Sequence, residues 1–224
     1  MYMRKIYIYI LVFSFVCIVF LYVMIGLYLH NYNVKVHKVD GYTVLEIENV
    51  LSGEECDKLI EHCVSDNMQN SEVVGENGNL VVDTQRKSKT LWLDDTEHHV
   101  AMKMANKSAL LTKYSRKYQE KLQVVCYEPG GKFDAHYDND YNSNVATRCA
   151  TLLVYLNDDY NGGETEFVKM GVTIKPKKGK GILFWSLDEK TQMIDASMHR
   201  GNTVENGNKW ICTKWTHIHP FDSK

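Results

Sequence analysis

The 224-residue sequence lacks a strong excess of charge of either sign, and it lacks internal repeats and low-complexity segments. Its 26 lysines and arginines nearly balance its 28 aspartates and glutamates, which leaves a formal net charge of −2. Such a chain has no global field that would attract nucleic acid or an acidic partner. We therefore expect no nucleic acid among its partners.

Cysteine is also sparse, and the six residues present do not define a redox compartment. Cys17 lies in an apolar N-terminal run, and Cys56 and Cys63 share one face of an expected helix but are too far apart to bond to each other. The other three fall in apolar runs typical of strands, where buried thiols are expected: Cys126, Cys149 and Cys212. One disulfide stays open as an alternative.

What the sequence does contain is a hydrophobic content of 44% and a charged content of 24%, typical of one folded domain. The segment Ile6–Leu29 has no formal charge. As a helix it would reach roughly 36 Å, enough to cross a bilayer core, and it is longer than the apolar region of a cleaved signal peptide. We expect a transmembrane signal anchor over residues 1–30, a stalk over 31–41 and the folded domain over 42–224.

Positive charges flank the expected membrane span on both sides. Arg4 and Lys5 lie next to it, whereas Lys35 and Lys38 lie further away. The positive-inside rule then favours a cytoplasmic N-terminus. The prediction is a single-pass, type II membrane protein whose folded domain is lumenal, as in the endoplasmic reticulum, or external.

The pattern of the folded domain predicts an α+β class. Ser52 and Glu55 form an S-x-x-E capping box before a helix over 53–67, and residues 94–118 predict a second helix with acidic residues in its first turn. After Glu120 the chain consists of short runs rich in β-branched and aromatic residues, separated by Gly, Asn and Pro. We expect a double-stranded β-helix, or jelly-roll, braced by the N-terminal helices.

The stretch "FDAHYDND", residues 133–140, predicts a metal site. If this region is a strand, His136 and Asp138 point to the same face, because side chains alternate. His199, in "ASMHRG", is the best third ligand. Two histidines and one carboxylate leave three positions open, which suits non-haem Fe(II). A catalytic zinc site is the alternative.

Lys209 predicts a site for an anion. We interpret "SMHRGNTVENGNKWICTKW" as a hairpin whose turn is Asn206-Gly207-Asn208 and whose second strand places Lys209 beside His199. Apolar neighbours make this lysine expensive to bury unless it meets an anion. A dicarboxylate co-substrate would supply one, whereas a solvent-facing strand lysine is the alternative.

Over residues 45–220 the sequence resembles the 2-oxoglutarate- and iron-dependent prolyl 4-hydroxylases, in their small, single-domain, membrane-anchored form. The resemblance rests on segments in the family's order and spacing: "RKSKTLWL", "LQVVCYEPGGKFDAHYDND", "RCATLLVYLNDDYNGGETEF", "PKKGKGILFW" and "SMHRGNTVENGNKWICTKW". It implies a role for nine residues. His136, Asp138 and His199 match the iron ligands; Lys209 and Tyr127 match contacts to 2-oxoglutarate; Thr151 is expected to line its pocket; and Arg148, Glu120 and Trp215 match positions of the peptide-proline site. Phe133 stands where some relatives have tyrosine.

The activity that the resemblance implies is hydroxylation of peptidyl-proline at the 4-position of the ring. Fe(II) and O2 take part, 2-oxoglutarate is converted to succinate and carbon dioxide, and L-ascorbate restores the iron after uncoupled turnovers. Three alternatives remain at this point: a dioxygenase acting on a residue other than proline, a zinc hydrolase, and a membrane-tethered binding module without catalysis.

Overall fold

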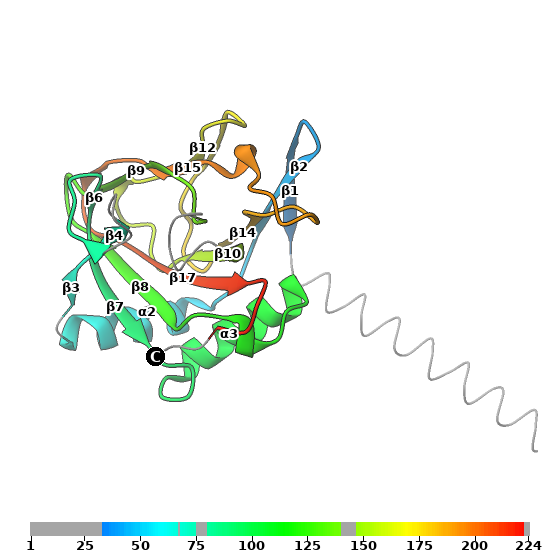
Figure 1. Ribbon diagram of the computed structural model, residues 1–224. Helices are drawn as coiled ribbons and strands as arrows, with labels where there is room; N and C mark the ends of the chain where they lie inside the picture. Colours follow the sequence, from blue (N-terminus) through cyan, green and yellow to red (C-terminus); the bar gives the residue numbers. More distant parts are fainter. Residues whose placement is uncertain (1–32, 67, 75–79, 140–146, 222–224) are drawn as a thin grey trace, which may run out of the picture. The chain divides into compact units, whose positions relative to one another are not determined.

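The computed structural model describes residues 33–66, 68–74, 80–139 and 147–221 (Figure 1). The expected membrane span, Ile6–Leu29, lies outside these residues. Within the described part of the chain, no helix combines the length and the apolar character needed to cross a membrane.

An eight-stranded sheet forms the larger layer of the fold (Figure 1). β17 is central, since it pairs antiparallel with β10 on one side and with β8 on the other. β1 lies within the stretch expected to be a stalk and forms one edge. In spatial order the strands are β1 (Val34–Val39), β2 (Tyr42–Ile47), β14 (Gly181–Trp185), β10 (Arg148–Tyr155), β17 (Lys209–His217), β8 (Leu122–Tyr127), β7 (Lys89–Leu93) and β3 (Gln69–Asn70).

A five-stranded sheet lies across one face of the larger sheet (Figure 1). Its order is β13 (Val172–Ile174), β12 (Thr165–Phe167), β15 (His199–Gly201), β9 (Lys132–His136) and β6 (Arg86–Lys87). Two short ladders complete the described strands: β11 (Asn161–Gly162) with β16 (Val204–Asn206), and β4 (Val73–Val74) with β5 (Leu80–Val81). This β-rich arrangement is consistent with the predicted jelly-roll class.

Two helices, α2 (Gly53–Ser65) and α3 (His99–Thr112), cover the opposite face of the larger sheet (Figure 1). Two short 3-10 turns are also present, η1 (Arg116–Tyr118) and η2 (Asp195–Ser197). The predicted capping box of α2 is confirmed, because the Glu55 amide donates to Ser52 Oγ at 3.2 Å and the Ser52 amide donates to the Glu55 carboxylate at 2.8 Å.

The second helix begins later than predicted. The Asp94 side chain accepts hydrogen bonds from the Thr96 amide at 2.9 Å and from its hydroxyl at 2.7 Å, which holds this segment in a turn. His98 then caps α3, since its Nδ1 accepts from the Val100 amide at 3.2 Å. The expectation of acidic residues in the first turn was therefore wrong.

The hydrophobic core between the two sheets contains aromatic and β-branched side chains from both layers. Tyr155 and Phe184 from the larger sheet pack with Phe167 from the smaller one. The Tyr155 hydroxyl is buried here, and it donates to Thr165 Oγ1 at 2.6 Å. This rigid core supports the strands that carry the candidate site.

Candidate active site

His136 and His199 face each other on paired strands. β9 and β15 are antiparallel, and His136 and His199 are direct partners in their register. Directly opposite residues of an antiparallel pair point to the same face of a sheet. The two ring centroids are consequently 4.4 Å apart, although the residues are distant in sequence.

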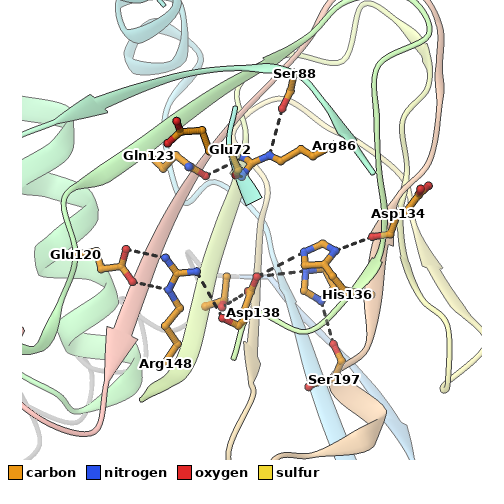
Figure 2. A network of polar contacts seen from close by, with 12 residues as sticks. Glu72, Arg86, Ser88, Glu120, Gln123, Asp134, His136, Asp138, Arg148 and Ser197 are labelled. Carbon is orange, nitrogen blue, oxygen red and sulfur yellow. Dashed lines mark hydrogen bonds and ion pairs between the residues drawn. The ribbon is translucent and has the colours of Figure 1, made fainter. Parts of the chain in front are cut away.

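Asp138 joins these histidines, but not for the reason predicted. β9 ends at His136, so Asp138 lies beyond the strand and side-chain alternation does not place it. Its Oδ2 instead accepts a 2.5 Å hydrogen bond from Thr151 on β10. Oδ1 is left 3.7 Å from His136 Nε2 and 3.8 Å from His199 Nε2 (Figure 2). Thr151 also lines a small cavity beside these residues, and its hydrogen bond orients the Asp138 carboxylate.

The donor set fits a single metal ion. His136 Nδ1 lies 2.7 Å from the Asp134 carbonyl oxygen, and His199 Nδ1 lies 2.9 Å from the Ser197 carbonyl oxygen. Because a carbonyl oxygen only accepts, each Nδ1 is a donor, and each Nε2 is left free as a metal ligand. The three ligand atoms lie within 4.8 Å of one another, and no other such group occurs in the described part of the chain.

Electrostatics favour the metal-binding protonation states of this group. Burial, together with neighbouring His136, lowers the pKa of His199 to about 4, so its imidazole is neutral at pH 7. Burial opposes the charge of Asp138, but the facing histidines and the Thr151 hydrogen bond outweigh it and hold the pKa of Asp138 below its ordinary value. A neutral imidazole and a carboxylate are the forms that bind a metal.

Lys209 closes a small cavity beside this group. The cavity measures about 40 Å³, and Tyr127 and Thr165 also line it. Lys209 is 2% exposed, its Nζ lies 5.0 Å from the centroid of the Tyr127 ring, and none of the described carboxylates forms an ion pair with it. Burial lowers the pKa of Lys209 to about 7. The charge of Glu164 opposes this shift. The predicted anion site therefore contains an enclosed lysine that forms no ion pair among the described residues.

The predicted hairpin between His199 and Lys209 was wrong. β15 pairs with β12 and β9 in the smaller sheet, whereas β17 pairs with β10 and β8 in the larger one. Lys209 sits opposite Tyr127 in its own sheet and reaches across the space between the layers. Gly163 leaves room for its side chain, since a Cβ there would lie 3.0 Å from the lysine Cδ.

Arg148, Glu120 and Trp215 form one buried group next to the metal ligands. Arg148 Nη2 donates to Glu120 at 2.8 Å (Figure 2). The guanidinium lies 3.7 Å from the centre of the Trp215 ring. His217 Nε2 lies 2.8 Å from the same carboxylate. A groove of about 950 Å³ is lined by Arg148, Trp215 and two metal ligands, but not by Glu120. Glu120 therefore acts on the groove only through Arg148.

Sequence reasoning missed Arg86 and Gln123, which line both the groove and the small cavity. Arg86 is 8% exposed and donates to Gln123 Oε1 at 3.1 Å (Figure 2). Its guanidinium lies 4.8 Å from the Phe133 ring, and Phe133 in turn stacks on His136 at 3.5 Å. Both residues lie in motif segments, but only long-range strand pairing brings them to the site.

Comparisons with known proteins agree with this geometry. Residues 122–217 match the 2OG-Fe(II) oxygenase superfamily. Prolyl 4-hydroxylase 2 of Arabidopsis thaliana is 33% identical over 201 residues, which cover 78% of this chain and 67% of that protein. Probable prolyl 4-hydroxylase 10 of the same plant is 34% identical over 197 residues, covering 77% and 68%.

A solved structure gives the same result. The viral collagen prolyl hydroxylase of Paramecium Bursaria Chlorella virus-1, in complex with 2-oxoglutarate, aligns with a TM-score of 0.63 and 31% identity, covering 77% of this chain and 94% of that one. Fold, site and relatives together define a 2-oxoglutarate- and Fe(II)-dependent oxygenase. Within that superfamily the chain belongs to the prolyl 4-hydroxylase family, which argues against the zinc hydrolase alternative.

Proposed function

We propose that this protein hydroxylates peptidyl-proline at the 4-position of the ring. The observation that carries the proposal is the buried Lys209, which forms no ion pair among the described residues and lines a small cavity with a His-Asp-His group. Two residues of that group, His136 and Asp138, also line a groove large enough for a peptide. The curated relatives are prolyl 4-hydroxylases, which supports proline as the residue modified.

His136, Asp138 and His199 would hold Fe(II), with Thr151 fixing the carboxylate of Asp138. Iron, 2-oxoglutarate and O2 together supply the oxidation that replaces a ring C–H by C–OH, while 2-oxoglutarate leaves as succinate and carbon dioxide. The contribution of the chain is to hold these groups and the proline in place and to keep water out.

Lys209 would bind the distal carboxylate of 2-oxoglutarate. A buried ammonium without an internal partner is stabilised when an anion arrives, and Tyr127 and Thr165 line the same cavity. The Thr165 hydroxyl lies 2.6 Å from the Tyr155 hydroxyl, which fixes its position in the cavity wall.

Arg148 and Trp215 would position the proline on the groove side of the metal. Glu120 and His217 hold the Arg148 guanidinium flat against the indole, which fixes both surfaces. Trp215 Nε1 is buried and has no hydrogen-bond partner among the described residues, so it is available to a substrate carbonyl. Glu120 is a positioning residue in this scheme.

The test is succinate release from 2-oxoglutarate with proline-rich and collagen-like peptides, followed by mass spectrometry of the peptides. A mass increase of about 16 Da on proline is expected, and His136→Ala, Asp138→Ala and His199→Ala should each abolish it while the domain still folds. Oxidation of another residue would support a dioxygenase with a different target. Normal turnover in a folded triad variant would refute the ligand assignment.

L-Ascorbate is proposed as the reductant that restores the iron after uncoupled turnovers, in line with the resemblance to this family. Without ascorbate, succinate release should decline over successive turnovers and recover when ascorbate is added. A constant rate without any reductant would argue against this role.

We also propose that residues 1–30 anchor the protein in a membrane and that the catalytic domain, expected over residues 42–224, lies on the lumenal or external side. The stretch 31–41, expected to be a stalk, would join the two and adds β1 to the edge of the larger sheet. The uncharged run Ile6–Leu29 supports the anchor. The full chain should resist carbonate extraction from membranes, whereas a chain starting at Asn31 should be soluble and active. In sealed vesicles the domain should be protected from added protease. Release by carbonate would exclude a span.

A further inference from the structure

Trp92 is a large aromatic side chain that the groove leaves half uncovered. It lies on β7 directly opposite Gln123 of β8, and both residues line the groove. Its ring centroid is 5.9 Å from that of Trp215, with an interplanar angle of 42°. Trp215 is 6% exposed but Trp92 is 44% exposed. The two indoles therefore form a continuous aromatic surface that runs outward from the candidate active site.

The position of Trp92 sets its distance from the reacting atoms. The strand order is β7, β8, β17, β10, and Thr151 of β10 binds the metal ligand Asp138. Three spacings of about 4.8 Å, with a small displacement along the strands, place Trp92 about 15 Å from Thr151. A polyproline II helix rises about 3.1 Å per residue. That separation corresponds to roughly five residues of an extended peptide.

The surroundings of Trp92 favour an apolar, rigid occupant. Val73 and Val82 also line the groove. Arg148 is already paired with the Glu120 carboxylate, and Arg86 is buried and donates to the amide oxygen of Gln123. Aromatic grooves recognise polyproline II helices because the rings pack flat on the indole and the peptide is already ordered.

We propose that Trp92 is a second proline-binding position of this groove. It holds the ring of a proline about five residues from the proline that reacts, and it thereby selects repeated prolines over isolated ones. This inference rests on the proposed prolyl hydroxylation, and it adds a specificity-determining residue outside the group around the metal.

The test compares two peptides of equal length. One has a single proline among Gly and Ala residues, and the other has further prolines about five residues to either side. The wild-type KM should be about tenfold lower for the second peptide, since burying one ring on an indole is worth about that factor. Trp92→Ala should remove the difference through KM, with kcat for the repeat peptide retained, and Trp92→Phe should restore most of it. Leu110→Ala, at a similarly exposed position on α3, is the matched control.

Equal discrimination by Trp92→Ala and the wild type would overturn the proposal, as would a loss of kcat shared by both peptides. If neither peptide is hydroxylated, the proposed function fails. The role of Trp92 is then tested separately, by measuring how tightly the wild type and Trp92→Ala bind the two peptides. Fluorescence anisotropy of labelled peptides with Mn(II) and 2-oxoglutarate then compares the two variants. A Trp92-dependent preference for the repeat peptide supports the second proline position, and equal binding of both peptides refutes it.

Discussion

Two lysines of β17 are buried in opposite ways. Lys209 and Lys214 are five residues apart, so their side chains leave the strand on opposite faces. Lys214 has a fully buried side chain and donates to Asp95 at 2.5 Å on the helix side. Lys209 faces the cavity and forms no ion pair among the described residues. The fold thus supplies a counter-charge for one lysine and leaves the other for a ligand.

Removing the Lys209 side chain should selectively weaken the binding of 2-oxoglutarate. In Lys209→Ala the distal carboxylate of 2-oxoglutarate would be buried without its partner, which typically costs about 2–5 kcal/mol, or roughly 30-fold to several thousand-fold. Lys209→Arg should be intermediate, because it keeps the charge in a tight cavity. The apparent KM for 2-oxoglutarate measures the effect, with Mn(II) affinity as the control. An unchanged KM would mean that another residue binds the carboxylate.

The binding of 2-oxoglutarate should also depend on pH. Burial lowers the pKa of Lys209 to about 7 in the free protein, below its ordinary value of 10.5, and a bound dicarboxylate would favour the charged form. Below about pH 7 the lysine is charged both free and bound, so affinity is greatest there. As pH rises through the window above 7, binding must take up a proton and affinity falls.

Calorimetric titration with 2-oxoglutarate in two buffers of different ionisation enthalpy measures this proton uptake directly. The wild type should take up protons at pH 8 but not at pH 6. Lys209→Ala is the matched control. Because it lacks the amine, it should not show the proton uptake expected of Lys209 at either pH. Identical uptake in the variant would assign the titration to a different residue.

At the scale of elements, the contact between β17 and the turn before α3 should matter for stability and not for catalysis. Asp95→Asn leaves the buried Lys214 cation without its carboxylate, which should cost about 3 kcal/mol of unfolding free energy. Urea unfolding measures this loss, and the KM for 2-oxoglutarate should not change. Asp57→Asn, which breaks the exposed pair with Lys178, is the control and should cost less than about 1 kcal/mol. Similar losses in both variants would contradict the argument.

Among the helices and strands, only features set by neighbouring residues could be predicted from the local sequence. The capping box of α2 was confirmed because its interactions span three residues. The end of β9 before Asp138 and the separation of β15 from β17 could not be predicted, since strand pairing over long sequence distances decides them. The correct grouping of His136, Asp138 and His199 came from their chemistry and the family resemblance. Arg86 and Gln123 needed the folded arrangement.

For the whole molecule, the described cysteines predict how the protein responds to thiol reagents. Five are free and buried, namely Cys56, Cys63, Cys126, Cys149 and Cys212. Burial raises the pKa of each, to about 11 for Cys56 and about 12 for Cys63, so little thiolate forms at pH 8.

A folded chain starting at Asn31 should therefore not react with a disulfide reagent such as DTNB at pH 8. After unfolding in denaturant without reductant, all five thiols should react. If fewer than five thiols react and the remainder become reactive only after reduction, the protein contains a disulfide. Rapid reaction of the native protein would show that a thiol is accessible.

The position of β17 has a consequence for biosynthesis. This strand is translated after β1 to β16, yet it lies in the middle of the larger sheet, between β8 and β10. A nascent chain that stops before Lys209 would have two half-sheets without the strand that joins them. Folding during synthesis proceeds from the N-terminus, and non-local pairing comes late. The ribosome must therefore release the segment Lys209–His217 before the sheet can close. Lys209, the proposed ligand of the co-substrate, consequently enters its cavity only when the larger sheet is completed.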